Sequence, residues 1–142
     1  MNLDFKKIFK AAKVPALALM ALTILGFVCA FFGLKTGLFM FPVQFAILGY
    51  AGYNGVKAFK LDLVNGAMAG AVASLMSMAF TVATALVSAV YDPVSPEVYA
   101  QAGMSGETII VFMFIGFLVM LIFSPILGFI FGIIGAYFAK KA

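Results

Sequence analysis

Four long apolar runs, separated by short polar gaps, constrain this chain more than any other feature. The runs cover about 14–34, 38–56, 63–91 and 108–139. Each is long enough to cross a hydrocarbon core of about 30 Å as an α-helix. A backbone in lipid must satisfy its own hydrogen bonds, and the two-residue alternation of a barrel is absent. We therefore predict an all-α fold: a polytopic membrane protein with one domain, a four-transmembrane-helix bundle.

The composition narrows the possible chemistry as well. Of the 142 residues, 65% are hydrophobic and 10% are charged, which is too little charge for the surface of a soluble domain. The chain has no His and no Arg, and its one cysteine, Cys29, lies in an apolar run. A zinc site of Cys and His is therefore excluded, and no nucleophile has a base beside it. We predict no enzymatic activity, no cofactor and no resident metal.

The lysines predict the orientation in the membrane. Eight of the nine lie in the N-terminal tail, in the second gap or at the C-terminus, and only Lys35 lies elsewhere. With four spans, those three segments share one side of the membrane. Because lysine collects on the cytoplasmic side, we expect a multi-pass plasma-membrane protein with both termini in the cytoplasm. Lysines confined to membrane boundaries also argue against nucleic-acid binding.

The N-terminal segment, residues 2–13, has two faces when drawn as a helix. Phe5, Ile8, Phe9 and Ala12 share one face, and lysines occupy the other. This pattern is typical of a helix lying in the membrane surface. The simpler interpretation, which we favour, is that the lysines only set the topology. We expect the first run to be a retained span, since its length of about 20 residues exceeds a usual signal core. The candidate contacts to lipid head groups are Lys6, Lys7, Lys10 and Lys13.

A short motif occurs twice, 83 positions apart. Each copy reads Pro, six residues, Gly, two residues, Gly, four residues, Lys. The motif suggests two duplicated helical hairpins related by an axis along the membrane normal. Chance is an equal alternative, because Gly and Pro are common in membrane helices, and no match joins the first and third runs. The two copies are Pro42, Gly49, Gly52 and Lys57, and Pro125, Gly132, Gly135 and Lys140.

The third run carries a stripe of small and hydroxyl residues spaced three and four apart. This spacing places the residues on one helix face, where small side chains allow a neighbouring helix to approach closely. We favour helix packing; the alternative is a polar wall along a solute path. The stripe consists of Ala67, Gly70, Ser74, Ser77, Thr81, Thr84 and Ser88.

The fourth run has a second ridge of small residues, Gly128, Gly132 and Ala136, that suits packing within the bundle or between copies. Pro42 and Pro125 remove one backbone hydrogen bond each and are candidate hinges, although such kinks are more often only shape. Gln44 is the best candidate for a functional amide at membrane depth. We favour a hydrogen-bonding role for it inside the bundle. A possible solute path would combine Gln44 with Ser77, Thr81 and Thr84.

The outer loop, residues 92–107, carries Asp92, Glu97 and Glu107. Three carboxylates can hold a divalent cation through their oxygens, but scattered acids in one loop are more often solvated charge. We therefore expect no metal site there.

Several short stretches resemble a bacterial four-span membrane protein family of uncharacterised function. They are the sequence Gly55-Val-Lys-Ala-Phe-Lys60, the pair Asp92-Pro93 and the glycine-rich last run that ends in Lys140-Lys141. The resemblance implies four helices with a basic second gap and an acidic outer loop, which is shorter in this chain. It covers topology and implies no active residues.

Two classes of function fit these observations. The first is a structural or accessory helical bundle, as a homo-oligomer or with other membrane proteins, and the glycine ridges and the lack of charge inside the spans favour it. The alternative is a small-solute or ion channel or transporter. Four helices rarely enclose a path alone, so this alternative requires an oligomer.

Overall fold

The computed structural model describes residues 3–34, 37–91 and 106–142 of the chain. All the regular structure in these ranges is α-helical, which confirms the all-α part of the predicted fold class. The four helices are α1 (Phe5–Phe31), α2 (Gly37–Lys57), α3 (Leu63–Tyr91) and α5 (Gly106–Lys141).

Three of these helices are long and apolar enough to cross a membrane. Within the described ranges the candidate spans are Phe5–Cys29, Leu63–Ala85 and Phe114–Lys141. Helix α2 matches the predicted run 38–56 in position but is not among the three. Its 21 residues include Gln44, Asn54 and two tyrosines, and these polar groups dilute its apolar character.

Helix α1 is longer than the predicted first span. We predicted a separate segment over residues 2–13, but one helix runs from Phe5 through Pro15 to Phe31. Ile8 and Ala12 of the predicted apolar face are fully buried, whereas Phe5 and Phe9 are more than half exposed. The start of α1 is therefore held by packing onto its neighbours, with Ile8 among Leu61 and Ala69.

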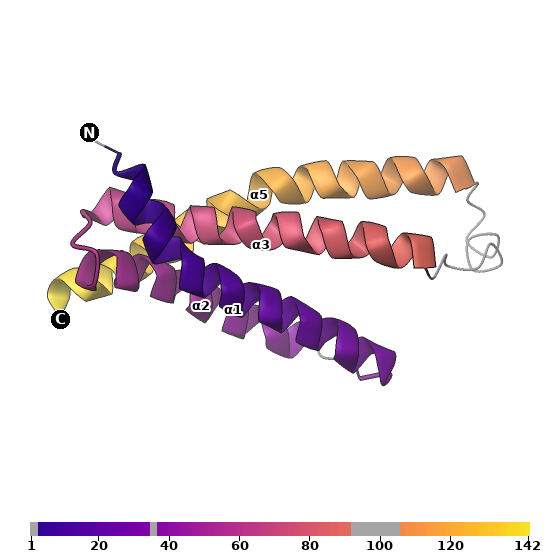
Figure 1. Ribbon diagram of the computed structural model, residues 1–142, viewed down its shortest axis with the longest axis horizontal. Helices are drawn as coiled ribbons and strands as arrows, with labels where there is room; N and C mark the ends of the chain where they lie inside the picture. The colour runs from indigo at the N-terminus through magenta and orange to yellow at the C-terminus, as the bar shows by residue number, and fades with distance from the viewer. Residues whose placement is uncertain (1–2, 35–36, 92–105) are drawn as a thin grey trace.

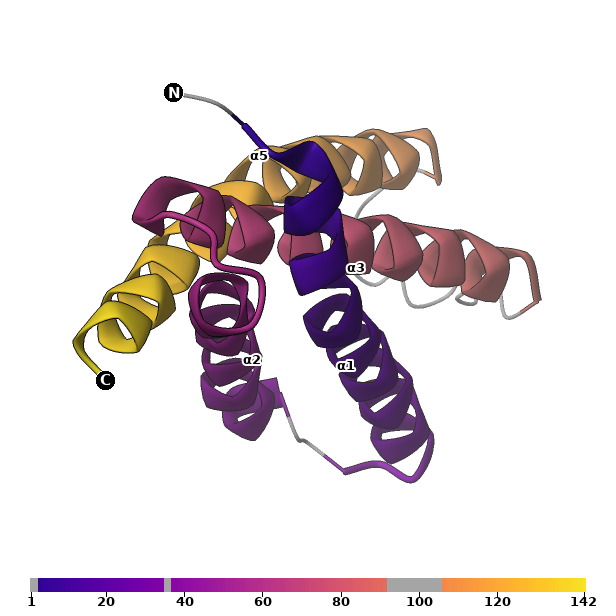
Figure 2. The ribbon, with the colours of Figure 1, turned by 60° about the vertical axis from the view of Figure 1, so that its left-hand side comes forward.

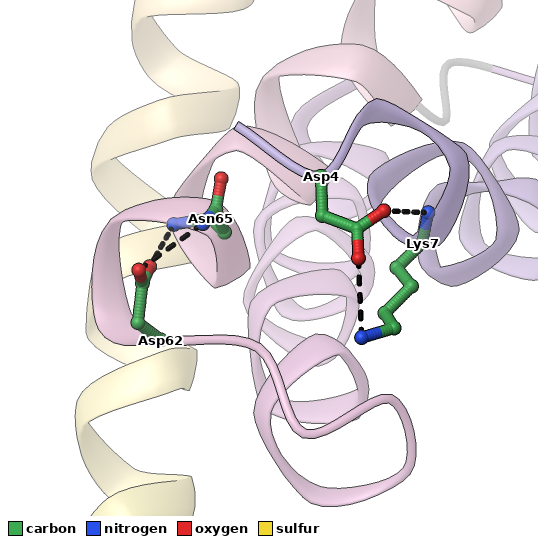
Figure 3. Close-up of polar contacts among 4 residues, drawn as sticks. All are labelled: Asp4, Lys7, Asp62 and Asn65. Atoms are coloured by element: carbon green, nitrogen blue, oxygen red, sulfur yellow. Dashed lines mark hydrogen bonds and ion pairs between the residues drawn. The ribbon is translucent and has the colours of Figure 1, made fainter. Parts of the chain in front are cut away.

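Aspartates cap the first turns of α1 and α3 (Figure 3). The backbone N–H of Asn65 donates to Asp62 Oδ1 at 2.7 Å, and Asn65 Nδ2 donates to Asp62 Oδ2 at 3.1 Å. The backbone N–H of Lys7 donates to Asp4 Oδ1 at 3.2 Å, and Lys7 Nζ forms an ion pair with Asp4 Oδ2 at 3.1 Å. Each carboxylate satisfies a donor that the first helical turn leaves unpaired. The caps fix where the two helices begin.

The helices converge at one end and separate at the other (Figures 1 and 2). Both chain termini and the connection from α2 to α3 lie where the helices converge. Away from it, α1 and α2 form one arm and α3 and α5 form another. We define the packed end as residues 5–19, 48–57, 63–74 and 128–141, and the open end as residues 20–29, 39–47, 75–85 and 111–127. Every buried helical side chain in the described part lies in the packed end.

Two adjoining clusters form the core of the packed end. One gathers alanines of α1, α2 and α3 around Leu19 and Leu48. The other joins Ile8 of α1 to Leu61 of the α2–α3 connection and to Ala69 of α3. Helix α5 contacts α2 and α3, whereas no contact joins α5 to α1 in the described ranges. Helix α5 therefore depends on α2 and α3 for its place in the bundle.

Candidate functional site

Small residues hold α3 and α5 in close contact, in antiparallel register. The pairs are Gly66 with Ala136, Gly70 with Gly132, and Ser74 with Gly128. A Cβ added at Gly132 would lie 2.7 Å from the carbonyl oxygen of Ala67, and one at Gly128 would lie 2.7 Å from the Cβ of Ser74. Atoms this close leave no room for a side chain, so glycine is required at these positions.

A second contact of the same kind joins α2 to α5. A Cβ added at Gly52 would overlap the carbonyl group of Gly132, and one at Gly135 would overlap the carbonyl group of Gly49. Gly132 thus lies where α2, α3 and α5 meet. We call the seven glycines of these two contacts the glycine seam. They are Gly49, Gly52, Gly66, Gly70, Gly128, Gly132 and Gly135.

The predicted ridge on the last run is covered within the chain. Gly128, Gly132 and Ala136 are buried against α2 and α3 of the same molecule. In this single chain the ridge therefore contacts other helices of the bundle.

Ser74 carries the interhelical hydrogen bond at the edge of this seam. Its hydroxyl donates to the carbonyl oxygen of Ser124 at 2.8 Å, and it also contacts the hydroxyl of Ser124. Ser124 directly precedes Pro125, where α5 lacks one backbone donor. In Figure 1, α5 changes direction between its orange first half and its yellow second half. The bond therefore ties α3 to the helix turn beside the proline.

Two further hydroxyls of the stripe, those of Thr81 and Thr84, bond to their own helix. Thr81 Oγ1 donates to the carbonyl oxygen of Ser77 at 3.0 Å. Thr84 Oγ1 donates to the carbonyl oxygens of Thr81 at 2.9 Å and Phe80 at 3.1 Å. Ser77, Thr81 and Thr84 are half-buried, and the side chain of Ser88 lies outside the described part. Bonds of this type leave a threonine on an apolar helix surface with no unmet polar group.

Gln44 and Pro42 lie on the open end of α2. Gln44 is half-buried, and within the described residues no hydrogen bond joins it to Ser77, Thr81 or Thr84. Pro42 is exposed, and α2 continues through it as a helix. The structure therefore does not bring Gln44 into one polar site with the hydroxyl stripe.

An apolar groove lies on the outer side of the α2–α5 contact. Its volume is about 390 Å³, and its floor is the close approach of Gly49 and Gly135. The rings of Phe45 and Phe131 stack at one end of it, with centroids 4.2 Å apart. Tyr50, Tyr53, Ile134 and Phe138 also line it. None of the residues predicted for a solute path lines this groove.

The charged side chains that the structure describes lie in or just before the first turns of α1, at the C-terminal ends of α2 and α5, or in the α2–α3 connection. Lys6, Lys7, Lys10 and Lys13 are all exposed on α1. The hydrogen bonds and ion pair from Lys7 lower the pKa of Asp4 below its ordinary value. Within the described residues no group of three acidic or cysteine side chains could hold a metal. Asp92 and Glu97 of the predicted acidic loop lie outside the described residues, as does the side chain of Glu107.

Sequence reasoning missed two parts of this arrangement. It began the stripe at Ala67, although Gly66, Gly70 and Ser74 recur every four residues and match the ridge Gly128, Gly132, Ala136. That match was the available signal for the α3–α5 seam. The aromatic groove had no comparable signal, because Phe45 and Phe131 become neighbours only when α2 and α5 pack.

Over residues 3–34, 37–91 and 106–142, the fold defines the class of protein: an all-helical bundle with three helices long and apolar enough to span a membrane. No family model, no curated protein and no solved structure matches the chain.

Proposed function

We propose that this protein is a four-span integral membrane protein of the plasma membrane that acts as a structural or accessory helical bundle. It works with further copies of itself or with other membrane proteins. The observation that carries the proposal is the glycine seam, which joins α2, α3 and α5 with no space for a solute between them.

The proposal makes α2 the fourth span. Its 21 residues would extend about 31 Å as a helix, close to the thickness of the hydrocarbon core. It is fixed against α5 through Gly49 and Gly52, and α5 is itself a candidate span. Gln44 and Asn54 are half-buried, so neither amide is fully presented to lipid.

The proposed orientation places the packed end in the cytoplasmic leaflet. Both termini and the α2–α3 connection lie at this end (Figure 1), and these segments carry eight of the nine lysines. The positive-inside rule then puts both termini in the cytoplasm. The same layout underlies the resemblance to a four-span bacterial family, which we carry forward for topology alone.

Reciprocal contacts support a duplication of the α2 and α5 helices. A shift of 83 positions carries Gly49 onto Gly132 and Gly52 onto Gly135. The two close contacts, Gly49 with Gly135 and Gly52 with Gly132, are exchanged by that shift, as a twofold axis requires. The likeness does not extend to the other helices, because α2 contacts α3 whereas α5 does not contact α1. We therefore propose a repeat centred on α2 and α5.

The hydroxyl stripe favours the structural function over transport. Ser74 bonds across the α3–α5 seam, and Thr81 and Thr84 bond to their own helix. A wall that conducts a solute must offer its polar groups to that solute. We propose no catalytic role, since the chain has no His or Arg and no nucleophile beside a base.

Vesicle permeability separates the two functions. The purified protein would be reconstituted in liposomes, and permeation of water, glycerol and potassium ions would be followed by light scattering. We expect the rates of empty liposomes, both for the natural chain and for Thr81→Val. Faster permeation that Thr81→Val alters would support a channel or transporter and overturn the structural proposal.

Labelling of single cysteines tests the topology. In a Cys29→Ser background, Ser95→Cys and Ala142→Cys would be treated in intact cells with a maleimide that cannot cross membranes. We expect Ser95→Cys to react and Ala142→Cys to react only after the cells are opened. Reaction of both, or of neither, before lysis would contradict four spans with cytoplasmic ends.

A further inference from the structure

We propose that the groove between α2 and α5 binds one anionic glycerophospholipid of the cytoplasmic leaflet. One acyl chain lies in the groove, and the phosphate is held by Lys57 and Lys141. The inference rests on the proposed membrane topology. It holds for either a structural or a transport role.

The groove has the shape and lining for an acyl chain. It is open along one side and lined almost wholly by apolar atoms, with Phe45 and Phe131 stacked at its inner end. From Phe45 to Tyr53 it extends roughly 12 Å along α2, most of the ~15 Å hydrocarbon depth of one leaflet. No side chain fills the bottom of the groove, because it is formed by Gly49 and Gly135. The two helices cannot move closer together there, because these glycines already touch.

The two helices run in the same general direction beside the groove (Figure 1), and they cross at the glycine seam, where Gly52 also contacts Gly132. Phe45 pairs with Phe131, and Gly49 pairs with Gly135 one turn further along. Both helices therefore reach their C-terminal ends on the same side, α2 at Lys57 and α5 at Lys141. An occupant of the groove meets both helix ends together.

Each lining face continues directly into a lysine. On α2, Tyr50, Tyr53 and Lys57 follow at spacings of three and four, so they share one face. On α5, Ile134 and Phe138 lead to Lys141 at spacings of four and three.

The exposed end of the groove therefore carries tyrosine hydroxyls and then two ammonium groups. Lys141 Nζ lies over the exposed ring of Tyr137, 4.8 Å from its centroid, beside the groove-lining Phe138 and outside the lining itself. Both lysines are exposed, and the two helix ends carry no acidic residue. This order of apolar lining, tyrosine and positive charge matches an acyl chain, an ester region and an anionic phosphate.

Native mass spectrometry tests the site on the full-length protein in detergent. The probes are phosphatidylglycerol and phosphatidylcholine with identical acyl chains. We expect one tightly retained phosphatidylglycerol. The variant Lys57→Gln/Lys141→Gln should weaken its binding by about fivefold per lysine while phosphatidylcholine binding stays the same. The matched control Lys60→Gln/Lys140→Gln, which makes the same charge change at two exposed lysines outside the two lining faces, should retain the natural affinity.

A second pair of variants tests the groove itself. Ala46 is exposed on the groove wall, and Ala46→Phe should reduce binding of both lipids. Ala79→Phe adds the same ring at an exposed position of α3, away from the groove, and should reduce neither. Inorganic phosphate at millimolar concentration should not displace the lipid, because it lacks the chain that the groove holds.

Three outcomes overturn the proposal: equal retention of the two lipids, equal effects of the two lysine double variants, or a dimer that Ala46→Phe converts to a monomer. The last would assign the groove to a second copy of this chain. Each of these outcomes leaves the cysteine-labelling result unchanged, so failure of the lipid site is distinguishable from failure of the topology.

Discussion

The packed end of this molecule has smaller side chains than the open end. Hydrophobicity alone predicts the opposite arrangement, in which the largest apolar side chains are buried. In an 18-residue apolar window of the candidate span Phe114–Lys141, 11% of the residues are buried, whereas 39% are buried in the corresponding window of the less apolar span Leu63–Ala85. The packed part of α3 is rich in Gly, Ala and Ser, and the open part of α5 is rich in Phe, Leu, Ile and Met. In lipid, burying apolar surface gains little, so helices associate where small residues let their backbones touch.

A lipid environment also explains the exposed apolar side chains of the open end. Along α5, the consecutive residues from Leu118 to Phe123 are each at least 47% exposed, so no face of the helix is covered there. A surface of this kind is unstable in water but suits lipid tails. The comparison therefore predicts that mutations act strongly at the packed end and weakly at the open end.

The largest effect should come from adding one methyl group to the glycine seam. In Gly135→Ala the new Cβ overlaps the backbone of Gly49, so α2 and α5 must separate. We expect a loss of about 2–3 kcal/mol in the free energy of unfolding, measured by titration from mild detergent into dodecyl sulfate. Gly52→Ala should cost a similar amount, since its contact with Gly132 is the reciprocal one.

Gly116→Ala is the matched control on the same helix. An added Cβ at Gly116 meets nothing within 4 Å, so the substitution should be neutral or should stabilise α5 by up to about 1 kcal/mol. Equal losses at Gly135 and Gly116 would remove the distinction between the two ends.

The sequence predicted the helices well because their limits depend on local chemistry. The predicted run 63–91 coincides with α3, and the run 38–56 lies within one residue of α2 at each end. Asp62 and Lys57 mark these limits as a cap and as a charge that stays out of lipid. Signals of this kind can be recognised from a few consecutive residues of the sequence.

The arrangement of the helices could not be predicted in the same way. Gly66 and Gly116 are both glycines in apolar helices, yet one is buried against Ala136 and the other contacts nothing. Which glycine is used depends on the register between helices far apart in the chain, and apolar composition does not encode that register. For the same reason, the sequence placed Thr81 and Thr84 on a shared stripe with Ser74 but could not show that only Ser74 bonds across it.

The cap of α3 should give the next largest effect. Asp62→Ala removes the acceptors for the backbone N–H and the side-chain amide of Asn65, which is buried at the packed end. We expect a loss of about 1 kcal/mol in the same unfolding titration. Asp62→Asn keeps an acceptor oxygen and should be nearly neutral. If both variants lost the same stability, the charge of Asp62 would matter more than its capping bond.

The bond between Ser74 and Ser124 sharpens the boundary between the two ends. A double-mutant cycle of Ser74→Ala and Ser124→Ala isolates the contact between the two hydroxyls, because Ser124→Ala keeps the carbonyl that accepts the other bond. We expect a coupling energy of about 0.6 kcal/mol, typical of hydrogen bonds between membrane helices. Thr81→Val with Ser124→Ala should give no coupling, because Thr81 bonds to its own helix. Coupling at Thr81 as large as at Ser74 would extend the packed end one to two turns further along α3.

The smallest effect concerns Asp4, at the exposed edge of the packed end. Hydrogen bonds from the side chain and backbone of Lys7 lower the pKa of Asp4, with smaller contributions from the charges of Lys7 and Lys6. A carboxyl whose pKa falls on folding contributes stability above its unfolded-state pKa, near 3.8, and loses it as the pH falls through the lower folded-state value. The stability that this cap contributes should therefore be constant from neutral pH down to about pH 5 and decrease only in stronger acid.

Carbon-13 NMR of the Asp4 carboxyl can follow the titration. Lys7→Gln should raise the pKa more than Lys6→Gln does, and equal shifts would mean that general charge, rather than the Lys7 contact, sets it.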